Sequence, residues 1–224
     1  MTAVKSWYAA ARNHPSGVLL GVQLIGILVY PFLGDQPLGR TVFGLFGLVV
    51  LALAVAAVRM TPSLTWVAGL LGLPVVVLTV VEGFAPDSDG VVLASSAFHA
   101  AFYLFTGWAL IRYMFEDDVA TRDEVFATGA TFTVLAWAFA YLFAATQIIW
   151  PGSFTAAVDP DEARTWVDLL FLSVTTLSST GLSDIVPVTP HGRSVVMIEQ
   201  IAGMLYLALV VARVTALTIN RSRI

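Results

Sequence analysis

Six long apolar runs, separated by short polar breaks, dominate the pattern of the chain. The runs cover about 17–33, 41–58, 64–82, 92–115, 125–149 and 192–218. Each approaches the roughly 20 residues that an α-helix needs to cross a bilayer. Charged residues, prolines and glycines separate the runs, as at 86–90 and 116–118. The pattern therefore predicts six transmembrane helices.

A seventh apolar segment, residues 164–177, is too short to cross a membrane. It lies between the fifth and sixth runs, and an apolar segment of this length beside spanning helices is typical of a re-entrant helix. Thr165 can cap its start, and Asp168 in the first turn suits the positive end of the helix dipole. The hydroxyl-rich run S-S-T-G-L-S-D follows at 178–184. We therefore expect a half-helix followed by a polar loop.

A re-entrant half-helix with a hydroxyl-rich loop can line an ion path. Irregular backbone at membrane depth is tolerated only where protein buries it or where it lines water. Carbonyl and hydroxyl oxygens can replace part of the hydration shell of a cation, and the C-terminal end of the half-helix is partly negative. One chain supplies one loop, so a ring of oxygens needs several copies around an axis. The sequence thus predicts an oligomeric cation pore.

The composition supports a membrane protein and excludes several other classes. Of 224 residues, 58% are hydrophobic and 12% charged, whereas soluble domains are about 45–50% apolar and about 25% charged. The net charge of −4 provides no basic surface for nucleic acid. Without cysteine and with three scattered histidines, the chain offers no disulfide, zinc-ligand pattern or cysteine nucleophile. We expect no enzymatic activity, because a G-x-S-G-like nucleophile with a late-span histidine is also missing, and no cofactor besides permeant ions.

The positions of lysine and arginine predict the orientation in the membrane. With the N-terminus inside, only Arg40, Arg164 and Arg193 of the eleven basic residues fall outside. We therefore expect a multi-pass protein of a prokaryotic cell membrane with both termini in the cytoplasm. The fourth span carries only Arg112, whereas a voltage sensor needs regularly spaced arginines or lysines. The four-helix region 1–120 is not expected to sense voltage.

The stretch from about 125 to 218 resembles the pore module of tetrameric potassium channels. The letters T-L-S-S-T-G-L-S-D at 176–184 align with the family pattern T-x-T-T-V-G-Y-G-D, and Ile185-Val186-Pro187 continues it as I-x-P. Gly192-Arg193 opens the inner helix, in which Gly203 takes the position of the family's hinge glycine. Phe139-Ala140-Tyr141 resembles the end of the family's outer helix.

This resemblance implies an all-α integral membrane fold. It would have six transmembrane helices plus a re-entrant pore helix and filter loop, and four copies would form a homotetrameric pore. The implied pore domain, 121–224, contains an outer helix at 125–149, a pore helix at 164–177, a filter at 178–184 and an inner helix at 192–218.

Two of the departures from the family pattern shape the expected filter. Leu182 replaces a tyrosine and loses the hydroxyl and ring that brace the filter. Ser183 replaces a glycine, and a non-glycine residue with positive φ costs roughly 1–2 kcal/mol. We therefore expect another backbone path in the outer half, fewer stacked carbonyl sites, a wider mouth and partly hydrated ions. In filter chemistry alone, S-T-G-L-S is also similar to the single-glycine filters of Trk, Ktr and plant HKT transporters.

The resemblance assigns a role to each candidate site residue. The filter would comprise Ser178, Ser179, Thr180, Gly181, Leu182 and Ser183, with monovalent cations, K⁺ or Na⁺, held at Ser179, Thr180 and Gly181. The supporting residues would be Asp168, Glu199 and Gly203. Asp184 would form an anionic ring at the pore mouth or bond to a neighbouring pore helix. Glu199 would form either a buried hydrogen bond behind the filter or a contact with the ion. Gly203 would serve either as a gating hinge or as a site of close helix packing. His99 is expected to be a satisfied interhelical donor.

The sequence thus predicts a tetrameric channel for monovalent cations with weakened or altered potassium selectivity. Its partners would be the lipid bilayer, other copies of the chain and monovalent cations, but not nucleic acid. Two alternatives stay open: a strictly potassium-selective channel that tolerates the filter variant, and a non-conducting membrane scaffold or sensor with a decayed pore.

Overall fold

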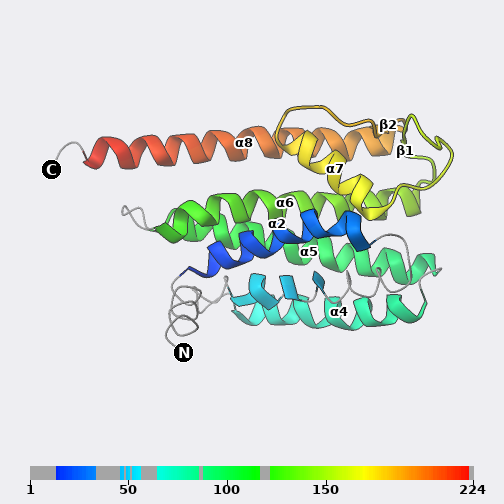
Figure 1. Ribbon diagram of the computed structural model, residues 1–224, viewed down its shortest axis with the longest axis horizontal. Coiled ribbons are helices and arrows are strands. Elements are labelled where there is room, and N and C mark those ends of the chain that lie inside the picture. The colour runs from blue at the N-terminus through cyan, green and yellow to red at the C-terminus, as the bar shows by residue number, and fades with distance from the viewer. Residues whose placement is uncertain are drawn as a thin grey trace. The chain divides into compact units, whose positions relative to one another are not determined.

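The computed structural model is mainly helical in the residues it describes (Figure 1). These residues are 14–33, 46–47, 49–50, 52–56, 65–85, 88–116 and 122–221. The helices are α2 (Pro15–Leu33), α4 (Thr65–Phe84), α5 (Asp89–Met114), α6 (Arg122–Ile149), α7 (Trp166–Leu177) and α8 (Pro190–Arg221). Two short strands, β1 (Phe154–Thr155) and β2 (Val186–Pro187), flank α7 along the chain.

Four of these helices are long and apolar enough to cross a membrane, judged by length and composition. They cover Trp66–Phe84, Asp89–Met114, Asp123–Ile149 and Pro190–Thr215. Two shorter apolar helices cover Pro15–Tyr30 and Trp166–Leu177. Half of the predicted span at 41–58 lies outside the described residues, so the total of six stays a prediction. The findings agree with an all-α membrane protein.

Two of the helices, α5 and α6, begin with acidic residues that suit the helix dipole. Asp89 lies in the first turn of α5 and Arg112 in its last turn, where the guanidinium stands over the Trp108 ring. Asp123 and Glu124 occupy the first turn of α6, which therefore begins three residues before the predicted start. Pro190 opens α8, because proline fits the first turn of a helix. The predicted start at 192 is two residues too late.

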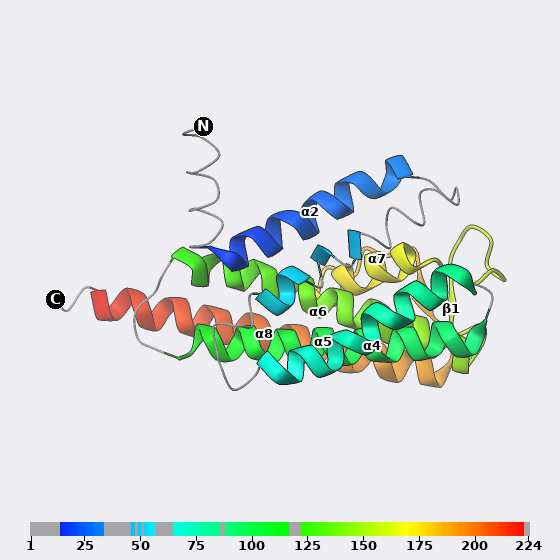
Figure 2. The same ribbon diagram turned by 90° about the horizontal axis from the view of Figure 1, so that it is seen from below.

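The chain forms two compact units, and α5 and α6 each contribute to both. The first unit comprises 1–84 and 105–134, and the second comprises 85–104 and 135–224. In the first unit, α2 packs along the first half of α6 (Figure 2). A Cβ at Gly129 would lie 2.7 Å from the Leu20 side chain, so this glycine permits the close approach.

Two buried polar contacts join α2 to α6 in the first unit. The backbone N–H and the hydroxyl of Ser16 donate to the Asp123 carboxylate at 3.2 and 2.9 Å. Farther along, Thr133 Oγ1 donates to Gln23 Oε1 at 2.7 Å. Buried polar groups in an apolar surrounding need such partners, so these contacts fix the register between the two helices.

The second unit places α7 against α6 and α8. Helix α7 lies beside the first part of α8 (Figures 1 and 2). Strands β1 and β2 pair antiparallel, with Phe154 opposite Pro187 and Thr155 opposite Val186. The paired strands therefore join the loop before α7 to the loop after it.

An aromatic cluster connects α5, α6 and α7 within the second unit. The His99 ring stacks on Tyr141 at 4.3 Å between centroids, and Tyr141 lies 5.3 Å from Trp166. Tyr103 and Trp137 extend the cluster, with Trp137 edge-on to Trp166 at 5.2 Å. Nδ1 of His99 lies 2.8 Å from the carbonyl oxygen four residues earlier in its own helix. His99 therefore contacts the neighbouring helix α6 through ring stacking on Tyr141, and its hydrogen bond lies within α5.

Candidate ion-conduction site

Helix α7 begins with a reciprocal capping arrangement. Thr165 is the N-cap, and its hydroxyl accepts a hydrogen bond from the Asp168 N–H at 3.2 Å. The Asp168 carboxylate accepts in turn from the Thr165 N–H at 2.9 Å. Such a capping box satisfies two backbone donors that the helix leaves unpaired. The predicted capping by Thr165 is confirmed, but the helix starts at Trp166, so the predicted start at 164 is two residues too early.

Arg164, just before the cap, organises the preceding loop. Its side chain is 8% exposed, and its guanidinium donates to the carbonyl oxygens of Val158, Asp159 and Glu162. Its backbone is held by Gln147 at the end of α6, with bonds of 2.9 and 3.1 Å to the side-chain amide. The guanidinium fork suits several oxygens at once. No motif in the sequence marks Arg164, so its position predicts only the side of the membrane on which it lies.

Helix α7 ends in a Schellman motif. The Ser179 N–H donates to the Thr176 carbonyl, and the Thr180 N–H donates to the Thr175 carbonyl, both at 3.0 Å. Ser179 between them has φ of 59°, a left-handed conformation that glycine usually provides at this position. The carbonyl groups of the last turn are therefore largely satisfied by the chain itself.

The residues after this cap fold back over the end of the helix. The Gly181 N–H also donates to the Thr175 carbonyl at 3.0 Å, and Gly181 is left-handed with φ of 66°. The hydroxyls of Ser178 and Thr180 lie 3.0 Å apart. This backbone turns sharply within a few residues, so it is unlike an extended strand.

The strained non-glycine residue is Ser179, whereas the sequence pointed to Ser183. Among the described residues, the non-glycine positions with positive φ are Asp159 and Ser179. The backbone at Ser183 therefore avoids the left-handed region, as expected for a serine in a glycine position. The Ser183 hydroxyl instead accepts from the Ile185 N–H at 3.1 Å. The left-handed turn occurs earlier because the helix cap requires it.

The backbone oxygens from Ser178 to Ser183 are available to a ligand. In the described part of the chain, no donor reaches these carbonyl groups. Ser179, Thr180, Gly181 and Asp184 are exposed, and Leu182 is 79% exposed. Helix α7 behind them is buried from Leu169 onward on most of its surface. In a single copy, this segment thus combines carbonyl groups that no described donor reaches with an exposed apolar side chain, Leu182.

Glu199 lies behind this segment and bonds to α7. Its side chain is 0% exposed, and its Oε1 is hydrogen-bonded to the Ser173 hydroxyl. The same hydroxyl donates to the Ala136 carbonyl of α6 at 2.8 Å. Of the two readings for Glu199, the structure shows the buried hydrogen bond.

Gly203 lies one turn beyond Glu199 on the same face of α8. A Cβ at this position would overlap the carbonyl group of Leu177, the last residue of α7. The buried positions of α8 recur every three or four residues, at Gly192, Val196, Glu199, Gly203 and Tyr206. This stripe faces α7 and the neighbouring loop, and Gly203 permits the closest approach, as the packing interpretation anticipates.

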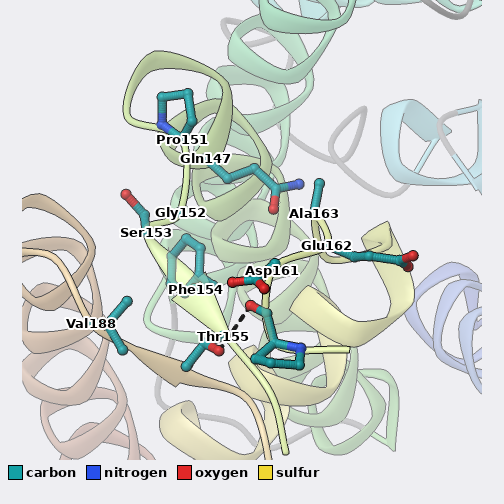
Figure 3. Close-up of a pocket in the computed structure, with 11 residues that line it drawn as sticks. Gln147, Pro151, Gly152, Ser153, Phe154, Thr155, Asp161, Glu162, Ala163 and Val188 are labelled. Carbon is teal, nitrogen blue, oxygen red and sulfur yellow. Dashed lines mark hydrogen bonds between the residues drawn. The ribbon is translucent and has the colours of Figure 1, made fainter. Parts of the chain in front are cut away.

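Asp168 and Asp184 line a common small cavity beside Arg164, with a volume of about 240 Å³. A larger cavity of about 410 Å³ lies among the loops before α7. Figure 3 shows Gln147, Phe154 and Asp161 around it, with the Thr155 hydroxyl bonded to the Pro160 carbonyl. No group of three metal-ligating side chains occurs among the described residues. Neither cavity therefore has the donor set of a metal centre.

Comparison with known proteins gives a match to one family model, over less than half of the chain but including this site. Residues 129–220 match the family model described as ion channel. No curated protein and no solved structure matches the chain. The matched segment includes most of α6, all of α7 and nearly all of α8, together with the loop at 178–184. With several apolar helices long enough to cross a bilayer, the match supports a membrane protein of an ion channel family.

Proposed function

We propose that the protein is a channel for monovalent cations, lined by residues 178–184 of several copies. The observation that carries the proposal is that no donor among the described residues reaches the carbonyl groups of residues 178–183, a largely exposed segment that follows a buried half-helix. At membrane depth, backbone of this kind must be buried in protein or line water. A lining of oxygen atoms suits a cation that sheds part of its hydration shell. The permeant ion, K⁺ or Na⁺, would bind at Ser179, Thr180 and Gly181.

Four copies around one axis would complete this lining. Away from its buried stripe, α8 exposes large apolar side chains that a single copy leaves uncovered: Met197, Ile198, Ile201, Met204 and Leu205. Lipid can cover one side of such a helix, and neighbouring copies can cover another. Closed cyclic symmetry is the usual arrangement of identical subunits, and the resemblance to tetrameric channels favours four copies. Asp184 would then stand at the mouth and concentrate cations.

The proposed selectivity is weaker than that of a strict potassium channel. Leu182 has no hydroxyl and is largely exposed, and Ser183 does not take up the left-handed conformation of the glycine it replaces. The second half of the lining therefore lacks a regular stack of carbonyl sites. We expect ions to pass this part with some of their water. The termini would lie in the cytoplasm, and the region 1–120 would not sense voltage.

Reversal potentials in planar bilayers test the proposal. The full chain, with K⁺ on one side and Na⁺ on the other, is expected to give comparable permeabilities for the two ions. Strong potassium preference would contradict weakened selectivity and favour the strict potassium channel. Absence of current and of flux in proteoliposomes would favour the non-conducting scaffold.

Two variants show whether the current passes through this segment. Gly181→Ala places a side chain on a left-handed residue and is expected to reduce conductance. Gly69→Ala is the matched control, because nothing lies within 4 Å of its added Cβ. Equal currents in the two variants would contradict conduction through residues 178–184.

A further inference from the structure

The hydroxyl of Ser173 contacts two oxygen atoms, although it carries a single proton. One contact is the Ala136 carbonyl at 2.8 Å, and the other is Oε1 of Glu199. A carbonyl oxygen is only an acceptor, and a hydroxyl group donates one hydrogen bond. If Ser173 donates to Ala136, the proton in the second contact must come from Glu199. An ionised carboxylate has no proton to give.

We infer that Glu199 is a neutral carboxylic acid and that its proton is a structural part of the site. Glu199 donates to the Ser173 oxygen, and Ser173 donates to the Ala136 carbonyl. This short chain of bonds runs from α8 through α7 to α6. All three residues belong to the second compact unit, so the three helices are joined through one hydroxyl and one acid proton.

The surroundings of Glu199 favour the neutral form. The side chain is fully buried, and its second oxygen, Oε2, has no hydrogen-bond partner within the described residues. On α8, α7 and α6, the segments 195–203, 169–177 and 132–140 contain no other charged side chain. Burying an ionised group without a partner costs far more than burying a neutral one, particularly inside a membrane. These three segments therefore supply no cation that could compensate a negative charge on Glu199.

The proton also connects Glu199 to the proposed ion path, and this step rests on the proposed function. Ser173 and Leu177 are one turn apart on α7, and they face Glu199 and Gly203 on α8. Glu199 is therefore a positioning residue that acts on residues 178–184 through α7. Without this proton, the Ser173 hydroxyl could donate to the Ala136 carbonyl or to the Glu199 carboxylate, but not to both. One of the two bonds, to α6 or to α8, would then be lost. We expect conduction to change when alkaline pH removes this proton.

Infrared difference spectroscopy tests the protonation directly, without relying on conduction. The spectrum of the full chain minus that of Glu199→Gln, both at neutral pH in lipid, is expected to show the carbonyl band of a protonated carboxylic acid. A matched control is Glu162→Gln, because Glu162 is exposed and its loss is expected to remove a carboxylate band. If Glu199→Gln also removes a carboxylate band and no acid band, the inference is overturned.

The pH dependence provides a second measurement. In Glu199→Gln the new side-chain amide can donate to Ser173 at any pH. The unmodified chain is expected to lose thermal stability at alkaline pH as Glu199 ionises, and this variant is expected to lose none. Identical profiles for both would contradict a structural proton. An acid band without any ion flux would uphold the neutral Glu199 and refute the channel, so the two proposals fail separately.

Discussion

Gly203 of α8 faces the carbonyl group of Leu177 so closely that a methyl group would not fit between them. Leu177 is the last residue of α7, and the predicted filter begins immediately after it. The contact therefore fixes where the half-helix ends relative to α8. Backbone atoms form the far side of the contact, so no side chain can rotate away to make room.

Replacement of Gly203 is expected to be destabilising. The Gly203→Ala side chain would push α8 away from the end of α7, and overpacking of this kind typically costs about 1–3 kcal/mol. Thermal unfolding of the protein in detergent or lipid measures the effect. Gly69→Ala, whose added Cβ meets nothing within 4 Å, should unfold at or above the temperature of the unmodified chain, because alanine favours a helix over glycine. Equal stability of the two variants would mean that α7 and α8 can separate freely.

Ser179→Gly is expected to stabilise the protein. Ser179 is left-handed at the helix cap, where a side chain costs about 1–2 kcal/mol relative to glycine. The matched change Ser183→Gly lies where the backbone is not left-handed, so it relieves no strain and should be neutral or slightly destabilising. Thermal stability of the two variants distinguishes them. The prediction is wrong if Ser183→Gly stabilises as much as Ser179→Gly.

Loss of the Thr165 hydroxyl is expected to weaken the start of α7. Thr165→Ala removes the acceptor for the Asp168 N–H, and such cap losses cost about 0.5–2 kcal/mol. Thr165→Ser keeps the acceptor and should retain most of the stability. Hydrogen exchange of the amides in the first turn of α7 measures the change locally. Unchanged exchange rates in Thr165→Ala would show that the cap does not stabilise the first turn of α7.

Arg164→Lys is expected to loosen the loop between α6 and α7. A lysine cannot reach the carbonyl groups of Val158, Asp159 and Glu162 together, because it lacks the planar fork. Hydrogen bonds to charged groups contribute about 1.5–3 kcal/mol each, so faster proteolysis of this loop should follow. Arg193→Lys is the control, since Arg193 is exposed and its side chain bonds only to the Pro187 carbonyl among the described residues. Similar cleavage rates would contradict an organising role for Arg164.

The helix cap and the long helices depend on residues that are close in the sequence, so local sequence patterns could predict them. Thr165 was predicted as the cap from its position just before the apolar segment, whereas the reciprocal bond from the Asp168 carboxylate was not predicted. The apolar runs predicted α4, α5, α6 and α8. Their starts differ by a few residues where a charge or proline extends the first turn.

Features that depend on contacts between distant residues could not be read from the sequence. The bonds of Ser173 to Glu199 and Ala136 join positions far apart in the chain, and a lone serine on an apolar helix gives no sign of them. The Schellman motif was missed because its left-handed position carries serine, where glycine is the usual signal. The pairing of Gln147 with Arg164 likewise needs the loop to be folded.

The contacts that close the loops around α7 also join two long helices to each other. Strands β1 and β2, the Ser153–Thr189 hydroxyl pair at 2.9 Å and the Trp150–His191 ring stack at 4.1 Å all tie the end of α6 to the start of α8. These two helix ends cannot part without breaking every one of those contacts. From Leu207 to Val214, by contrast, most α8 side chains are exposed. A movement of α8 that preserves these contacts would therefore leave its first part in place, with Glu199 and Gly203 near the bend, and would displace its C-terminal half.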